Sequence, residues 1–526
     1  MKSKSGSMSR RGFLGAAAVS GAMVNTSMAA AQGKAAELVI HTDRGKETIS
    51  RHLYGHFSEH LGRCIYGGYW VGEDSRIPNV RGIRTDIVDA LKKIRIPNLR
   101  WPGGCFADYY HWKDGVGPKS ERPEMLNLWW GEVLENNHFG THEFMDLCEQ
   151  LETEPYVAGN VGSGTVREMQ QWVEYLTASK GPMADWRRSN GRAQPWRVQY
   201  WGVGNENWGC GGRMRPEVYA DLYRQYSNYV RDFGDNKMYR IAGGANRGNY
   251  TWTEVMMREA KRFMQGLSVH YYTSNRHPKL GLQGSATHFK EDEWMFFLKA
   301  ACAIDELMKS HSEIMDDFDP EKQVGMVLDE WGSWYAAEPG TNPRFLYQQN
   351  SLRDALIAGI HLNIFNGHCE RLKMANIAQT INVLQAMILT DNEKMLLTPS
   401  YHVFDMYQDH QDATLLPVDL DCGEYTYGKD ALPALNASAS RSKSGKILLT
   451  LCHLDPNRSC TIQCRVQGAG SHNVAGRILT ADTMTAHNTF DRPNAVEPRD
   501  FTGVTIANGG LTVEAPPMSV IALTIG

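Results

Sequence analysis

The stretch YWGVGNENWG, residues 200–209, places a carboxylate at the end of an apolar run. Aromatic and β-branched residues lead up to a glycine, and Glu206 follows between two asparagines. An apolar run of this length and composition predicts a buried strand. Glu206 is therefore a candidate for a site at the carboxyl end of that strand.

Short apolar runs of the same kind recur through residues 51–395, and helical patterns separate them. In residues 84–94, for example, apolar side chains recur at steps of three and four, as on one face of a helix. Eight strands, each followed by a helix, predict an α/β fold of the (β/α)8 TIM-barrel type. The predicted strands are residues 52–57, 97–104, 155–162, 198–206, 239–246, 267–273, 324–330 and 372–379.

The pattern changes after the barrel. Residues 396–526 contain short strands separated by turn residues, which predict a C-terminal β-sandwich domain. Within residues 32–50, the stretch AELVIHTD is expected to add one strand to that sandwich.

The N-terminus resembles an export signal. Paired arginines in SRRGFLG (residues 9–15) precede an apolar run that is too short to span a bilayer. We therefore interpret residues 1–31 as a signal peptide of the twin-arginine type, with an ordinary secretory signal as the alternative. Either signal predicts an exported protein, periplasmic or extracellular.

Composition excludes some classes of partner. The 526 residues carry 55 basic and 59 acidic side chains, a net charge of −4, with no long run of one sign. This balance gives no reason to expect nucleic acid or a membrane surface as a partner of the mature protein. Ten cysteines show no CxxC or zinc-type spacing, and disulfides stay open, including a pair of Cys452 and Cys460 across a turn.

A second carboxylate occupies the same kind of position as the first. Glu330 ends the strand VGMVLDE, so the fourth and seventh barrel strands each deliver a glutamate to the barrel's C-terminal end. Two facing carboxylates are what a retaining glycosidase requires, one as acid and base and one as nucleophile. Trp208, Trp331 and Trp334 would add apolar faces for sugar rings. A single glutamate at a strand end is more often a helix cap or an ion-pair partner, so the hypothesis depends on the pair.

Six stretches, in chain order, resemble the α-L-arabinofuranosidases of glycoside hydrolase family 51. They are residues 55–73, 99–118, 201–212, 267–273, 328–335 and 374–386. The resemblance implies that Glu206 is the general acid/base and Glu330 the nucleophile of a retaining, exo-acting enzyme. That enzyme would release terminal α-L-arabinofuranosyl residues from arabinose-containing oligo- or polysaccharides. It also allows a homo-oligomer, since relatives are often hexamers.

The resemblance further implies substrate contacts, position by position. Asn205 would hold the sugar 2-hydroxyl, Glu59 other hydroxyls, and Tyr272 would stand near the nucleophile. Further sugar-contacting positions are Cys105, Trp334 and Gln379. Residues 110–140 fit the family pattern less well, so neither Trp129 nor Trp130 is assigned a contact.

Other readings stay open. The same barrel could belong to an endo-glucanase or a xylosidase, or to a non-catalytic sugar-binding protein. His56, Glu59 and His60 could suggest a metal, but on a strand the two histidines and the glutamate point to opposite faces. His270 is interpreted as structural or substrate-orienting rather than as a metal ligand. We therefore expect catalysis without a metal or a cofactor.

Overall fold

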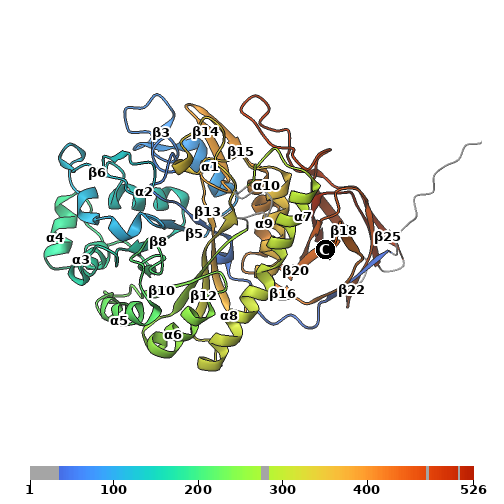
Figure 1. Cartoon of the computed structure of the whole chain (residues 1–526), viewed down its shortest axis with the longest axis horizontal. Coiled ribbons are helices and arrows are strands. Elements are labelled where there is room, and N and C mark those ends of the chain that lie inside the picture. The colour runs from blue at the N-terminus through green and yellow to red at the C-terminus, as the bar shows by residue number, and fades with distance from the viewer. Residues whose placement is uncertain (1–34, 274–283, 469–472, 508–509) are drawn as a thin grey trace, which may run out of the picture. The chain divides into compact units, whose positions relative to one another are not determined.

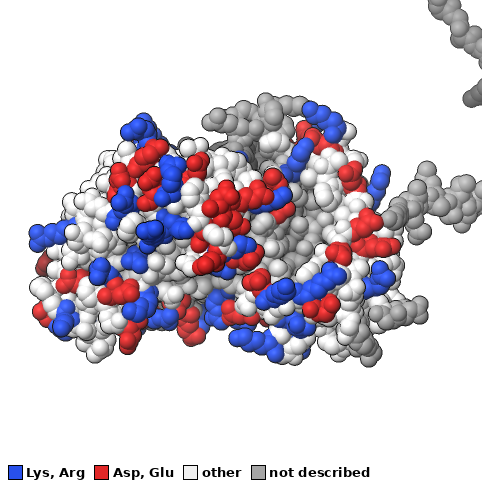
Figure 2. Space-filling model, turned by 90° about the horizontal axis from the view of Figure 1, so that it is seen from below, with Lys and Arg blue, Asp and Glu red and all other residues white. Residues whose placement is uncertain are grey.

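A computed structural model describes residues 35–273, 284–468, 473–507 and 510–526 of the chain. The predicted signal peptide, residues 1–31, lies outside the described residues. Within the described part of the chain, no helix is long and apolar enough to cross a membrane. Acidic and basic side chains are interspersed on the face shown in Figure 2, without a region of one sign, as the net charge of −4 suggests.

Eight parallel strands close into a barrel, which confirms the predicted TIM-barrel fold (Figure 1). Each predicted strand is present, and each pairs with its sequence neighbours, the last returning to the first. The barrel strands are β2 (Gly55–Phe57), β5 (Asn98–Trp101), β8 (Glu154–Gly159), β9 (Tyr200–Val203), β10 (Tyr239–Asn246), β11 (Gly266–Thr273), β12 (Gly325–Ser333) and β13 (Leu372–Ala378).

Helices surround the barrel and bury apolar side chains against it. They are α1 (Thr85–Lys93), α2 (Thr141–Leu151), α3 (Val166–Thr177), α4 (Pro182–Ser189), α5 (Pro216–Ser227), α6 (Tyr250–Ala260), α7 (Glu291–Cys302), α8 (Ile304–Phe318), α9 (Leu352–Gly367) and α10 (Pro399–Tyr407). Helix α10, which follows β13, begins past residue 395, where the sequence suggested that the barrel ends. The division of the chain into domains at that residue stays a proposal.

Two mostly antiparallel sheets pack face to face beside α9 and form the C-terminal sandwich (Figure 1). The five-stranded sheet has the order β17 (Val418–Asp421), β1 (Ala36–His41), β22 (Cys460–Gln467), β26 (Gly510–Ala515) and β25 (Val504–Ala507). The six-stranded sheet has the order β16 (Thr414–Leu416), β20 (Leu435–Arg441), β21 (Ile447–His453), β27 (Ser519–Ile525), β23 (Val474–Leu479) and β24 (Arg499–Asp500). Strand β1, which precedes the barrel in the chain, thus belongs to the sandwich and pairs with β17 and β22.

Helix α9 joins the barrel to the sandwich. Nearly all of its side chains are buried, so its apolar residues surround the whole axis instead of forming one stripe. On its sandwich side, Asn363 Nδ2 donates to Asn436 Oδ1 at 2.8 Å, and Asn366 Nδ2 donates to Ser438 Oγ at 3.2 Å. These contacts fix the barrel strand that precedes α9, β12, relative to the second domain.

Four two-stranded hairpins complete the sheets of the described residues. They are β3 (Asn79–Val80) with β4 (Ile83–Arg84), β6 (Met125–Leu126) with β7 (Leu134–Glu135), β14 (Ile388–Asp391) with β15 (Lys394–Leu397), and β18 (Glu424–Tyr427) with β19 (Asp430–Pro433). The β6–β7 hairpin belongs to the long connection after β5, and it supplies one side of the site described next.

Candidate active site

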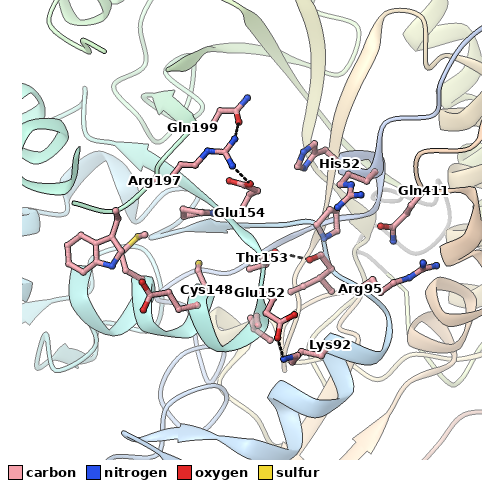
Figure 3. Close-up of a pocket in the computed structure, with 18 of the residues that line it drawn as sticks. His52, Lys92, Arg95, Cys148, Glu152, Thr153, Glu154, Arg197, Gln199 and Gln411 are labelled. Carbon is pink, nitrogen blue, oxygen red and sulfur yellow. Dashed lines mark hydrogen bonds and ion pairs between the residues drawn. The ribbon is translucent and has the colours of Figure 1, made fainter. Parts of the chain in front are cut away.

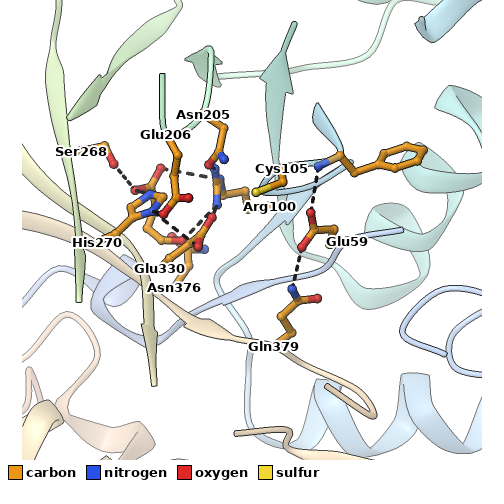
Figure 4. A network of polar contacts seen from close by, with 12 residues as sticks. Glu59, Arg100, Cys105, Asn205, Glu206, Ser268, His270, Glu330, Asn376 and Gln379 are labelled. Carbon is orange, nitrogen blue, oxygen red and sulfur yellow. Dashed lines mark hydrogen bonds and ion pairs between the residues drawn. The ribbon is translucent and has the colours of Figure 1, made fainter. Parts of the chain in front are cut away.

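Polar side chains from five barrel strands meet at the C-terminal end of the barrel (Figure 4). Glu206 follows β9, Glu330 belongs to β12, and His270 belongs to β11. Arg100 extends from β5, and Glu59 follows β2. The structure therefore brings together the two glutamates that the sequence predicted, at the end of the barrel where TIM-barrel enzymes carry out their chemistry.

A tight turn after β9 presents Glu206 to the site. Gly204 has φ of 85° and Glu206 has φ of 43°, so both adopt the left-handed backbone region. A Cβ at Gly204 would come within 2.4 Å of Asn207 Oδ1, which explains why a glycine occupies this position. The turn directs the Glu206 carboxyl across the mouth toward β11 and β12.

Buried Asp108 holds this turn in place. Its Oδ2 accepts from the Asn205 backbone N–H at 2.7 Å, and its Oδ1 accepts from Val161 N at 2.7 Å and Gly162 N at 2.8 Å. Burial raises the pKa of Asp108 to about 7, although these N–H donors oppose the shift. One side chain thus connects the segments that follow β5, β8 and β9.

His270 lies between the two glutamates. Its Nδ1 is 2.9 Å from Glu206 Oε1 and 3.4 Å from Glu330 Oε2. One oxygen of each carboxyl group and a nitrogen of His270 all lie within 4.8 Å of one another.

Both carboxylate oxygens of Glu330 accept a hydrogen bond. Arg100 Nη1 donates to Oε1 at 2.8 Å, and Tyr272 OH donates to Oε2 at 2.8 Å. The other terminal nitrogen of Arg100 donates to Asn205 Oδ1 at 2.6 Å. Arg100 therefore fixes Glu330 and the amide orientation of Asn205 together.

Burial raises the pKa of Glu206, and the negative charge of Glu330 raises it further. The hydrogen bond from His270 and the charge of Arg100 oppose this rise. Glu206 is partly exposed, with 18% of its side chain accessible, whereas the Glu330 side chain is 6% accessible. The two carboxyl groups thus have different environments and different access to solvent.

Glu59 forms a second polar group beside the pair. Its Oε1 accepts from Trp130 Nε1 at 2.9 Å and from Phe106 N at 3.0 Å, and its Oε2 accepts from Gln379 Nε2 at 2.9 Å. Burial and the charge of Glu330 raise the pKa of Glu59 to about 7. Trp130, which the sequence left without an assignment, is thus in direct contact with a predicted substrate-binding residue.

A disulfide joins Cys105 to Cys210, with the Cα atoms 5.5 Å apart. It connects the segment after β5 to the segment after β9, and Cys210 Sγ lies 3.6 Å from Glu206 Oε2. No spacing pattern predicts this pair, since the two cysteines are 105 positions apart. The alternative pair is not formed: Cys452 and Cys460 are free and lie on β21 and β22, in different sheets.

The three predicted tryptophans have different positions. Trp334 is half-buried, and its ring centroid is 5.1 Å from that of Tyr272. Trp208 is also half-buried and donates from Nε1 to Gly244 O at 3.1 Å. The prediction for Trp331 was wrong: its side chain is fully buried among the outer helices, against Phe365 and Phe404. Side chains alternate along a strand, so Glu330 faces the barrel mouth and the next residue faces away.

Sequence reasoning missed Arg100, Asp108 and Asp329 and did not place His270 between the glutamates. A signal was present, because Arg100, His270 and Asp329 are polar residues within barrel strands. Their roles depend on contacts between strands that are distant in sequence. Glu206, His270 and Glu330 are close enough to share a metal ion, but they already bond to each other and to Arg100, and the expectation of metal-free catalysis stays a prediction.

The cavity at the opposite end of the strands has a different character. It has a volume of about 780 Å³ and adjoins the N-terminal ends of β5, β8 and β9 (Figure 3). Its charged side chains are paired with one another, for example Arg197 with Glu154 and Lys92 with Glu152. We therefore assign the chemistry to the C-terminal end, despite the size of this cavity.

Comparisons with known proteins agree with this geometry. Residues 90–290 match the family described as Alpha-L-arabinofuranosidase 1 domain, and residues 329–519 match the Alpha-L-arabinofuranosidase C-terminal domain. A Bacteroides ovatus protein named intracellular exo-alpha-L-arabinofuranosidase is 49% identical over 96% of this chain and 99% of its own length.

Solved structures give the same result. The GH51 arabinofuranosidase from Xanthomonas axonopodis pv. citri superposes with a TM-score of 0.92 at 50% identity and covers 94% of this chain and 100% of its own. The Thermotoga maritima alpha-L-arabinofuranosidase, solved as an arabinose complex, has a TM-score of 0.80 at 30% identity and covers 93% and 99%.

The comparisons also correct the predicted location. The prediction of export depended on residues 1–31 alone, and these lie outside the described structure. The Bacteroides ovatus relative, which aligns over nearly the whole chain, is named intracellular. The prediction of an exported protein is therefore contradicted: paired arginines before a short apolar run are too small a pattern to identify a signal peptide.

Proposed function

Because the chain belongs to the α-L-arabinofuranosidases of glycoside hydrolase family 51, we propose that it is a retaining, exo-acting enzyme with two catalytic glutamates. It would release terminal α-L-arabinofuranosyl residues from arabinose-containing oligo- or polysaccharides. The observation that carries the mechanism is the distance of at most 4.8 Å between one oxygen of Glu206 and one of Glu330. Retaining glycosidases hold their carboxyl groups about 5–5.5 Å apart, and inverting enzymes hold them about 6.5–9.5 Å apart.

Glu330 is the nucleophile in this proposal. Arg100 and Tyr272 each donate to one of its oxygens, which stabilises the carboxylate and aligns it. Attack on the anomeric carbon forms a bond from a Glu330 oxygen and breaks the bond to the leaving oxygen. The electron pair of the broken bond remains on the leaving oxygen, which receives a proton from Glu206.

Glu206 is the acid and then the base. Its raised pKa keeps a proton available for the leaving oxygen while Glu330 is ionised. In the second half, Glu206 accepts a proton from water as the water oxygen bonds to the anomeric carbon. The Glu330 oxygen then leaves as a carboxylate, and the configuration at the anomeric carbon is retained.

Buried polar atoms without a partner support a small sugar as the substrate. Gln379 Oε1 and Trp334 Nε1 have no hydrogen-bond partner within the described residues. Arg100 holds Asn205 Oδ1, and the Asn205 amide nitrogen has a long contact of 3.9 Å to Cys210 Sγ, which a substrate hydroxyl could replace. Such atoms cost free energy when unpaired, and sugar hydroxyls would pair with them. We propose as substrate-binding residues Glu59, Cys105, Asn205, Tyr272, Trp334 and Gln379.

The proposal is tested by the sugar that the enzyme releases. Purified protein is incubated with 4-nitrophenyl α-L-arabinofuranoside, arabinan, arabinoxylan and β-glucan, and the products are identified by chromatography. We expect arabinose as the only monosaccharide product, with no shortening of the β-glucan chain. A Glu330→Gln variant serves as the control for contaminating activity. Glucose oligomers or xylose in place of arabinose would overturn the proposal.

A further inference from the structure

His270 contacts a carboxylate through each ring nitrogen (Figure 4). Its Nδ1 faces Glu206 and Glu330, and its Nε2 lies 3.2 Å from Asp329 Oδ1. The side chain is only 5% accessible, so water does not separate these groups. A neutral imidazole has one N–H, whereas the imidazolium has two. Both nitrogens can donate to these carboxylates only when His270 is doubly protonated.

Asp329 is fixed as an anion behind the ring. Tyr156 OH donates to its Oδ2 at 2.6 Å, Ser268 Oγ donates to its Oδ1, and Arg100 Nε lies 3.6 Å from Oδ2. Although burial raises the pKa of this carboxyl, Arg100 and His270 hold it well below its usual range. Asp329 is 2% accessible. It can therefore act on the reaction only through His270 and Arg100.

The charges around His270 favour its protonated form. The groups that face it or its partners are Glu206 after β9, Asp329 and Glu330 on β12, Arg100 on β5, Tyr272 and Ser268 on β11, and Tyr156 on β8. Burial lowers the pKa of His270, but Glu330, Asp329 and Glu206 together raise it to about 10. The single positive charge of Arg100 does not balance the negative charges of the carboxylates. The imidazolium of His270 supplies the second positive charge.

We propose that Asp329 is a positioning residue that keeps His270 doubly protonated throughout the reaction, so that Glu206 can act as a base in its second half. The inference rests on the proposed function and extends it. In the resting enzyme, the charge of Glu330 favours a proton on Glu206. That charge is lost when Glu330 forms its bond to the sugar. The cations Arg100 and His270 then face Glu206, and they favour its ionised form.

Asp329→Asn is the variant that tests this role. Asparagine has the same shape and can still accept from His270 Nε2, but it carries no charge. Tyr156→Phe is the matched control, since it removes one hydrogen bond to Asp329 and leaves the carboxylate charged. Thermal unfolding of both variants, compared with the parent, shows whether each is folded.

The first readout is the protonation of His270 in the resting enzyme. The ¹⁵N chemical shifts of labelled histidine are recorded against pH, and the His270 signals are assigned by their loss in His270→Asn. We expect both ring nitrogens protonated at pH 8 in the parent and in Tyr156→Phe, and only one in Asp329→Asn. A singly protonated His270 in the parent at pH 7 would overturn the inference.

The second readout is the pH profile of the second half-reaction. With 2,4-dinitrophenyl α-L-arabinofuranoside the leaving group departs readily, and kcat reports hydrolysis of the intermediate. In Asp329→Asn we expect the acidic limb of kcat to move to higher pH by about one to three pH units. If Asp329 has only a structural role, its replacement will lower kcat equally at every pH and the acidic limb will stay in place. That outcome would contradict the inference.

The two readouts separate this inference from the proposed function. The NMR experiment needs no substrate, so its result tests the protonation of His270 even if arabinose is not the sugar released. If the parent enzyme releases no arabinose, the proposed function fails whatever the state of His270. If it releases arabinose and His270 is neutral, only the present inference fails.

Discussion

The two ends of the barrel use charged side chains in opposite ways. At the C-terminal end, Arg100, Asp329 and Glu330 are at most 6% accessible and form one network with His270. At the N-terminal end, the Arg197–Glu154 pair lines the cavity of about 780 Å³, and its side chains are 69% and 33% accessible. Exposed pairs are screened by water and contribute little free energy, whereas buried charges without partners are costly. The site is thus identified by the burial of its charges and not by the size of the hollow beside them.

The largest effect should come from Glu330. Glu330→Ala removes the carboxylate that forms the bond to the sugar, and we expect the rate on every substrate to fall by about 10⁴-fold or more. The measurement is kcat/KM on aryl arabinofuranosides and on arabinan. Comparable activity on any of these substrates would show that another group is the nucleophile.

Replacing Glu206 should lower the activity by an amount that depends on the leaving group and on pH. Glu206→Ala should slow substrates with poor leaving groups by about 10²–10⁴-fold, because those substrates need the proton. Burial and Glu330 raise the pKa of Glu206, so the acid form persists to higher pH and is lost as the pH rises through that pKa. The alkaline limb of kcat/KM should therefore disappear in the variant on an activated substrate. An unchanged limb would assign it to another group.

Loss of the disulfide should lower the stability of the fold. Replacing both Cys105 and Cys210 by serine should lower the free energy of unfolding by about 2–4 kcal/mol, since the bridge closes a long loop. Denaturant unfolding measures the change. Cys460→Ser is the control, because Cys460 is free and lies in the sandwich. Equal stability of the double variant and the control would show that the bridge does not constrain the chain.

The smallest effect should come from a substitution at the N-terminal end of the barrel. Arg197→Ala breaks the exposed pair with Glu154, and we expect the free energy of unfolding to change by less than about 1 kcal/mol. Values of kcat and KM should equal those of the parent. A loss of activity in this variant would mean that the cavity at the N-terminal end contributes to the reaction, and the contrast between the two ends would not hold.

The barrel could be predicted from the sequence because its strands are short apolar runs with clear ends. Glu206 and Glu330 could be predicted for the same reason, since each follows such a run. Helix α9 is buried on nearly all sides and has no apolar stripe, so its place followed from the alternation of strands and helices and not from its own pattern. The assignment of Trp331 to the site failed because one residue along a strand reverses the direction of the side chain.

The rest of the site depends on contacts between distant segments. The Cys105–Cys210 bridge, the contact of Trp130 with Glu59 and the position of His270 between two carboxylates all join residues at least 60 positions apart. No local pattern encodes these contacts. They follow only from the closure of the barrel, which brings the carboxyl ends of its strands together.

The assignment of the two glutamates is tested most directly by the product that azide forms with Glu206→Ala. Without a base, the variant should form the arabinosyl-enzyme from an activated aryl α-L-arabinofuranoside and then hydrolyse it slowly. Azide needs no proton removed, so it should restore turnover by attacking the intermediate. Two inversions then give α-L-arabinofuranosyl azide, which NMR identifies. A β-azide from Glu206→Ala, or rescue by azide in Glu330→Ala alone, would contradict the roles given to Glu206 and Glu330.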